Sequence, residues 1–118
     1  MDADIISVYT RQQAIEDGSF IDVTGVAKKN GFTIPIALTT NLFHSHIKSD
    51  NDALTNRRLH LFLLILYKKI VESDKSDNML CTSFDFGDGK QTKVWAVIEP
   101  QSPTDPSPAM NIMLPEDY

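Results

Sequence analysis

A continuous apolar run from Leu61 to Tyr67 stands out from the mixed pattern of the rest of the chain. Polar residues flank this run on both sides, and the whole segment predicts one long helix over residues 53–73. A turn-rich break precedes it, where Asp50 or Asp52 could cap the helix. A helix that is apolar around its whole circumference is buried on most sides, so we expect this one at the centre of the fold.

Three shorter helices are predicted before the long one. The first covers residues 11–17, begins at the capping-box pair Thr10 and Gln13, and ends at the glycine that follows it. The second covers residues 25–30 and the third covers residues 35–48. The third begins at a proline and carries an apolar stripe, formed by Leu38, Leu42, Phe43 and Ile47.

Extended structure is predicted mainly in the C-terminal third. Residues 79–86 and 91–98 are rich in strand-forming residues and flank a glycine-rich turn, which indicates a hairpin. Residues 99–109 hold four of the six prolines and are expected to form a loop. Residues 110–114 are predicted to be a third strand, and residues 20–23 a short extended link.

The order of these elements, helices first and strands afterwards, predicts an α+β domain. We expect N-terminal helices and one central buried helix packed on a small antiparallel sheet of about three strands. The 118 residues fit one domain, residues 1–118, without internal repeats. A chain of this size buries roughly two-thirds of its surface and needs no metal or disulfide to fold.

Charge is unevenly distributed along the chain. The net charge is −5, and no Lys or Arg follows Lys93, whereas four acidic residues do: Glu99, Asp105, Glu116 and Asp117. A negative surface disfavours general nucleic-acid binding. The acidic end is expected to serve solubility, with a contact surface for a basic partner as the alternative.

The location of the protein is predicted from what the chain lacks. Met1 is followed by Asp2, so the start does not look like a secretory signal, and the apolar run is far shorter than the ~20 residues that span a bilayer. Cys81 is the only cysteine, which fits a reducing compartment. We therefore expect a cytoplasmic protein without membrane contact.

The histidines and the acidic turn are the first candidates for metal binding. His44 and His46 are two residues apart on a predicted helix, so they point about 200° apart and cannot share a metal. We expect an exposed His44 and a partly buried His46, with His60 on the next helix. Residues 85–89 resemble a calcium loop only superficially, and a turn explains their glycines and aspartates better. No metal site or cofactor is predicted.

Catalytic chemistry is equally weakly indicated. Cys81 has no activating base or cation beside it in the predicted strand. The chain contains no phosphate-binding loop, dinucleotide-binding fingerprint, nucleophile elbow or zinc-protease motif. We therefore do not expect an enzyme. A small enzyme or ligand-binding domain around Cys81 or His60 is kept as an alternative.

Basic residues form two small clusters on the long helix. They are Arg57, Arg58, Lys68 and Lys69. About 15 Å of helix separates the two clusters, so solvated helix ends are the simpler interpretation and a nucleic-acid surface is the alternative. Elsewhere, Arg11 and Asp22 could brace the extended link.

Several short stretches resemble a family of short bacterial proteins of unknown function that are carried by plasmids, conjugative elements and phages. The matching residues are Tyr9–Thr10–Arg11, Ala14–Ile15, Asp17–Gly18, Asp22–Val23, Gly31–Phe32, Pro35, Ala37–Leu38–Thr39 and Ile112–Met113–Leu114–Pro115–Glu116–Asp117. Phe43 stands where a Trp is expected in the family. The resemblance carries no catalytic residues and implies a small accessory protein of a mobile element.

These observations favour a non-enzymatic interaction protein of a phage or plasmid. Its expected task is to block a host protein or complex, such as a restriction or CRISPR complex, as an anti-defence (anti-CRISPR or anti-restriction) protein. The candidate contact surface comprises Trp95, Glu99, Asp105, Glu116 and Asp117. A nucleic-acid-binding accessory protein is the alternative, and Met79, Trp95 and an exposed strand edge could support a homodimer.

Overall fold

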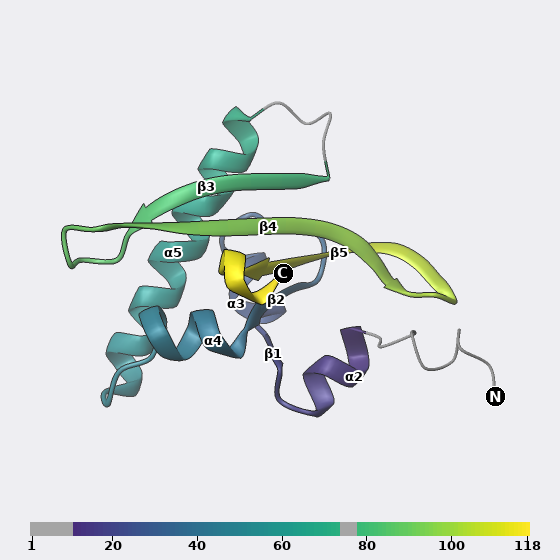
Figure 1. The fold of residues 1–118 in the computed structure, drawn as a ribbon, viewed down its shortest axis with the longest axis horizontal. Coiled ribbons are helices and arrows are strands. Elements are labelled where there is room, and N and C mark those ends of the chain that lie inside the picture. The colour runs from purple at the N-terminus through teal and green to yellow at the C-terminus, as the bar shows by residue number, and fades with distance from the viewer. Residues whose placement is uncertain (1–10, 74–77) are drawn as a thin grey trace.

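A computed structural model of the chain describes residues 11–73 and 78–118 (Figure 1). In chain order its elements are α2 (Arg11–Glu16), β1 (Phe20–Asp22), α3 (Thr24–Lys29), β2 (Ile36–Thr39), α4 (Thr40–Leu42), the π-helix η1 (Phe43–Ile47), α5 (Asp52–Glu72), β3 (Met79–Asp85), β4 (Gln91–Ser102), β5 (Asp105–Met113) and the 3₁₀-helix η2 (Pro115–Asp117). The predicted cap Thr10 lies outside the described residues.

The strands form one five-stranded sheet in the order β1-β2-β5-β4-β3. All neighbouring strands are antiparallel except β2 and β5, which are parallel. The mixed α and β composition is thus confirmed, and β3, β4 and β5 are the three antiparallel strands that the sequence predicted. The prediction was incomplete because two N-terminal strands extend the same sheet.

The first correction concerns the predicted third helix, residues 35–48. Its first turn is instead strand β2, and helical structure begins only at Thr40. Ile36 and Leu38 are fully buried and lie opposite Met110 and Ile112 of β5. This interior position in the sheet outweighs local helix signals, because pairing with two strands and burying these side chains stabilises the extended form.

The second correction concerns the link at residues 20–23. It is extended as predicted, but residues 20–22 form β1, a strand at the edge of the sheet, which pairs with β2 through Phe20 and Thr39. The link is therefore part of the sheet. Only the pairing with β2 makes it a strand, since three residues give too short a pattern to predict one.

The third correction concerns the proline-rich residues 99–109, which were predicted to be a loop. They form the end of β4 and the start of β5, joined by a two-residue turn. Pro100 and Pro108 lie opposite each other, and the register shifts between Pro100 and Ser102. Proline removes a donor from a strand but is tolerated at irregular positions of this kind. The side chain of Ser102 accepts hydrogen bonds from the Thr104 and Asp105 amides, which closes the turn.

The long helix is confirmed as α5, which crosses behind β3 and β4 in Figure 1. Its cap is Asn51, whose Oδ1 accepts from the Leu54 amide at 3.1 Å, and neither of the two predicted aspartates caps it. One side of α5 packs on the sheet through Leu59, Phe62, Leu63 and Leu66. The expectation of burial on most sides is wrong, because large apolar side chains on its other side are exposed.

The opposite face of the sheet is covered unevenly. Helix α2 lies against one end of this face through the buried Ala14, and η2 lies beside the middle of β4. The part formed by β3 and the adjoining half of β4 carries the exposed Cys81 and the half-buried Trp95. Among the described residues, no helix is both long and apolar enough to cross a membrane.

Candidate functional site

The outer side of α5 carries most of the exposed large apolar side chains in the described part of the chain. Those side chains are Leu54, Leu61, Leu64, Ile65, Val71 and Tyr118, and all but Tyr118 belong to α5. Leu61 is 56% exposed, Leu64 38% and Ile65 36%. These three residues are neighbours on a helix surface, being spaced i, i+3 and i+4, and we call them the α5 patch.

The sequence produces two apolar sides because the run at residues 61–67 has no polar position to define one outer side. Leu59, Phe62, Leu63 and Leu66 follow helical spacing on the inner side. The α5 patch follows the same spacing on the outer side. The apolar pattern therefore indicated burial of the whole helix, whereas the protein covers only half of it.

Basic side chains flank the α5 patch at both ends. Arg57 and Arg58 precede Leu61 by four and three residues, and Lys68 follows it by seven, so all three lie on the outer side of α5. Each is exposed. Lys69 differs, because it is half-buried and its Nζ lies 5.5 Å from the centroid of the Phe84 ring. The two predicted basic clusters are thus separated by an apolar surface.

An aromatic groove runs beside the α5 patch, between α5 and the β3–β4 turn. Its volume is about 220 Å³, and its walls include His46, Phe62, Phe84 and Phe86 besides Leu61 and Ile65 of the patch. The His46 ring stacks on Phe86 with centroids 4.6 Å apart. The sequence predicted a partly buried His46 correctly, but not its place in this groove.

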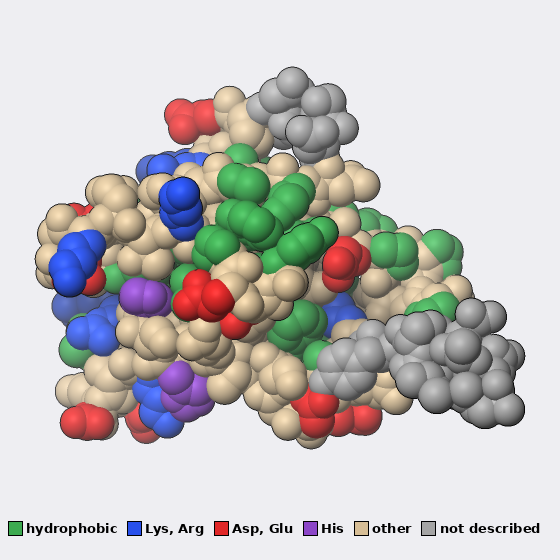
Figure 2. Space-filling view, viewed as in Figure 1, with side chains coloured by type: hydrophobic (Ala, Val, Ile, Leu, Met, Phe, Trp, Pro, Cys, Tyr) green, Lys and Arg blue, Asp and Glu red, His purple; other side chains and the backbone are tan. Residues whose placement is uncertain are grey.

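The predicted contact residue Trp95 lies on the other side of the molecule, on the open face of the sheet. Its ring contacts Tyr118 edge to face, with centroids 5.2 Å apart. Figure 2 shows hydrophobic side chains gathered over β3 and β4 on this side. Met79 and Cys81 of β3 lie beside β4 here, paired with Val97 and Trp95 respectively. This face is a second candidate surface.

Only two of the four predicted acidic residues lie near Trp95. Glu116 and Asp117 lie in η2, close to Trp95, whereas Asp105 lies at the turn between β4 and β5. Glu99 is four residues further along β4, about 13 Å from Trp95, and binds Asn111. The proposed acidic surface is therefore distributed over three places.

Asp117 has a structural task that the sequence did not reveal. Its carboxylate accepts from the Thr39 hydroxyl at 2.8 Å, the Leu114 amide at 3.1 Å and the Asn41 side-chain amide at 3.1 Å. These bonds tie the C-terminal end to the start of α4. Glu116, by contrast, is exposed.

The remaining predicted candidates do not assemble. His44 is exposed, as expected, and the His60 ring contacts Asn30 at 3.1 Å. The turn interpretation of residues 85–89 is confirmed, since Asp85 accepts from the Gly87 and Gly89 amides. Within residues 11–73 and 78–118, no group of three His, Cys, Asp or Glu side chains could hold a metal ion.

Residues 1–60 match the model of a family of unknown function, DUF6573. The chain belongs to this family. No curated protein and no solved structure matches the chain. The DUF6573 match ends at residue 60, inside α5, so the α5 patch and strands β3, β4 and β5 lie beyond the matched residues. Membership of DUF6573 assigns no activity to the chain. Evidence about its function therefore comes from the surfaces of the structure.

Proposed function

We propose that this protein is a non-enzymatic binding protein whose partner docks on the outer side of α5. The observation that carries the proposal is the exposure of Leu61, Leu64 and Ile65 side by side on one helix. Covering such a surface contributes about 1–2 kcal/mol of binding free energy for each apolar side chain that is buried. An exposed apolar cluster with a polar rim is typical of protein interaction sites.

The surroundings of the α5 patch indicate the chemistry of the partner. Arg57, Arg58 and Lys68 would attract acidic side chains on both sides of an apolar segment. The aromatic groove offers a pocket for one bulky apolar side chain, which is the usual form of an interface hot spot. The partner is therefore an acidic, amphipathic protein segment.

Two other occupants of the α5 patch are disfavoured by charge. A second copy pairing through α5 would bring Arg57 and Arg58 against the same arginines in a parallel arrangement. In an antiparallel one they would lie near Lys68, whose end of the helix carries the single acidic residue Glu72 on this side. Nucleic acid would place phosphates over the apolar side chains that separate the basic groups. A homodimer through the β3 edge and the nucleic-acid alternative stay predictions.

We also propose that the protein acts in the context of a mobile genetic element. The support is the sequence resemblance to short proteins of plasmids, conjugative elements and phages. A binding protein in that context would inhibit a host factor, such as a restriction or CRISPR complex, by covering a surface that the factor needs. A protein that inhibits in this way needs no catalytic residues of its own.

Affinity capture with matched surface variants tests the docking site. The wild-type protein, Leu61→Glu and Tyr118→Ser are used as baits in extracts of a host cell, since both substitutions change exposed residues. We expect a partner that the wild type and Tyr118→Ser retain and that Leu61→Glu loses. Titration of the purified partner should then show binding weakened at least about tenfold by Arg58→Glu and by added salt.

The opposite pattern would contradict the proposal. A partner lost with Tyr118→Ser and retained with Leu61→Glu would move the docking site to the open sheet face around Trp95. Circular dichroism and thermal unfolding of each bait show whether a variant that loses the partner is still folded. Sedimentation of the wild type alone checks for self-association.

A further inference from the structure

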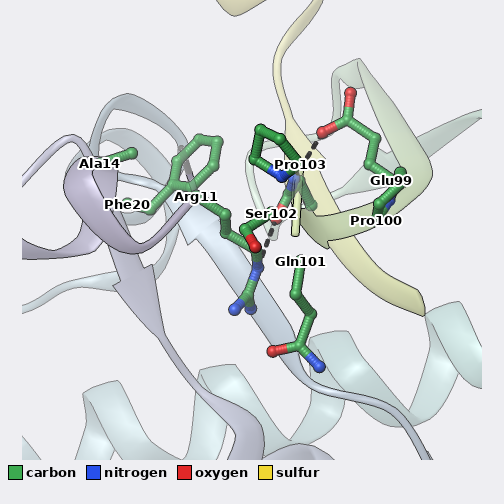
Figure 3. Close-up of a pocket in the computed structure, with 9 residues that line it drawn as sticks. Arg11, Ala14, Phe20, Glu99, Pro100, Gln101, Ser102 and Pro103 are labelled. Carbon is green, nitrogen blue, oxygen red and sulfur yellow. Dashed lines mark hydrogen bonds between the residues drawn. The ribbon is translucent and has the colours of Figure 1, made fainter. Parts of the chain in front are cut away.

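A second hollow lies on the other side of the sheet, where α2 meets the β4–β5 hairpin (Figure 3). Its volume is about 410 Å³. Its walls combine apolar and polar groups from distant parts of the chain, among them Arg11, Phe20, Glu99, Pro103 and Asn111. A hollow of this size is in the range of small-molecule sites.

A buried amide holds a cation and an anion in this pocket. Asn111 is only 1% exposed, and its Oδ1 accepts from Arg11 Nε at 3.0 Å. Its Nδ2 donates to Glu99 Oε2 at 2.8 Å. Figure 3 draws both contacts as dashed lines, with Arg11 and Glu99 converging on the amide from different elements. A buried Asn bound on both sides fixes the two charged groups in place.

Part of the Arg11 guanidinium has no acceptor among the residues that the structure describes. Nη2 is buried and has no hydrogen-bond partner within the described residues. Burial lowers the pKa of Arg11 from its ordinary value, and the charge of Asp22 counteracts this only in part. Buried guanidinium N–H groups are normally paired, so among the described residues this group still has a hydrogen bond to gain.

We propose that this pocket binds a small zwitterion of the α-amino-acid type. The ligand carboxylate would pair with the Arg11 guanidinium at the wall of the pocket, and its ammonium group would donate to Glu99. An apolar ligand side chain would lie against Phe20 and Pro103. A simple anion fits less well because the carboxylate of Glu99 would repel it. The proposal does not depend on the α5 patch, which lies on the opposite face of the sheet.

Isothermal titration calorimetry with three related probes tests the proposal on the wild-type protein. L-leucine carries both charges, L-leucinamide lacks the carboxylate, and 4-methylpentanoate lacks the ammonium group. We expect L-leucine to bind at least about tenfold more tightly than either analogue, since each lost charged contact is worth a factor of this order. Absence of any L-leucine binding, or equal binding of an analogue, would overturn the proposal.

Matched variants assign the binding to the two charged groups. Arg11→Gln and Glu99→Gln should each weaken L-leucine binding about tenfold or more, whereas Lys93→Gln should not, as it changes an exposed residue of β4 outside the pocket. Glu99 is exposed, so Glu99→Gln gives a decision even if Arg11→Gln fails to fold. Unchanged L-leucine affinity in Glu99→Gln would refute the assignment. Leu61→Glu should retain L-leucine binding, which keeps this test separate from the docking proposal.

Discussion

The ring of Tyr67 on α5 lies directly against the backbone of Gly31, the residue that ends the turn after α3. A Cβ on Gly31 would come within 2.9 Å of Tyr67 Cζ, and Gly31 has a φ of +105°. The same ring contacts Phe32 edge to face, with centroids 5.4 Å apart. Gly31 therefore joins two requirements, a left-handed backbone and room for an aromatic ring.

We predict that Gly31→Ala destabilises the protein by about 1–3 kcal/mol, because it combines backbone strain with overlap against Tyr67. The matched control is Gly25→Ala, where an added Cβ meets nothing within 4 Å and the glycine is helical. That change should be neutral or stabilising by up to about 1 kcal/mol. Urea unfolding of both variants measures the difference in unfolding free energy. Equal stabilities would show that the Tyr67 ring moves aside at little cost.

Asn111→Leu is predicted to cost about 2–4 kcal/mol of unfolding free energy. The substitution keeps the number and branching of the side-chain heavy atoms but leaves Arg11 Nε and Glu99 without their shared partner, and a charged group left unpaired near the core is costly. Asn56→Leu, at an exposed position near the start of α5, should stay within about 0.5 kcal/mol. Chemical denaturation measures the unfolding free energy of both variants. An unchanged value for Asn111→Leu would mean that water replaces the amide as the partner of Arg11 and Glu99.

The two neighbouring acidic residues of η2 should behave differently. Asp117→Ala removes the acceptor for Thr39, Leu114 and Asn41, so we expect a loss of about 1–3 kcal/mol. Glu116→Ala should change stability by less than about 0.5 kcal/mol. Thermal unfolding with both variants at one pH provides the comparison. If Glu116→Ala proved the more damaging change, the assignment of a stabilising role to the three hydrogen bonds of Asp117 would be wrong.

The turn between β4 and β5 should respond to acid through Asp105. The side-chain hydroxyl and then the amide of Ser107 donate to its carboxylate, and these bonds hold the pKa of Asp105 below its ordinary value. A lowered pKa stabilises the folded turn above the unfolded pKa, and this contribution is lost as the pH falls through the folded pKa. NMR titration of the carboxyl carbon should show the low pKa in the wild type.

Ser107→Ala should raise the pKa of Asp105 toward its ordinary value, because the larger of the two contributions comes from the hydroxyl. Ser83→Ala, remote on β3, should leave it unchanged. An equally low pKa in Ser107→Ala would assign the effect to the backbone of the turn instead.

Local signals predicted the elements whose stability is mainly local. The long helix appeared at residues 52–72, the hairpin strands at residues 79–85 and 91–102, and Gly18 and Gly31 have the positive φ values of chain reversals. Capping, turn geometry and side-chain period act over a few neighbouring residues, so a single sequence carries them. Local signals did not predict the strand at residues 36–39, because this strand depends on pairing with β1 and β5.

The sequence by itself determined an α-and-β protein with one long apolar helix. Only the tertiary structure decided that α5 is covered on one side, leaving Leu61 exposed between basic residues. It also brought Arg11 and Glu99 to the same buried amide from positions far apart in the chain. The physical reason is common to both. An apolar pattern indicates that a surface favours burial, but the arrangement of the sheet decides which surfaces the chain itself can cover.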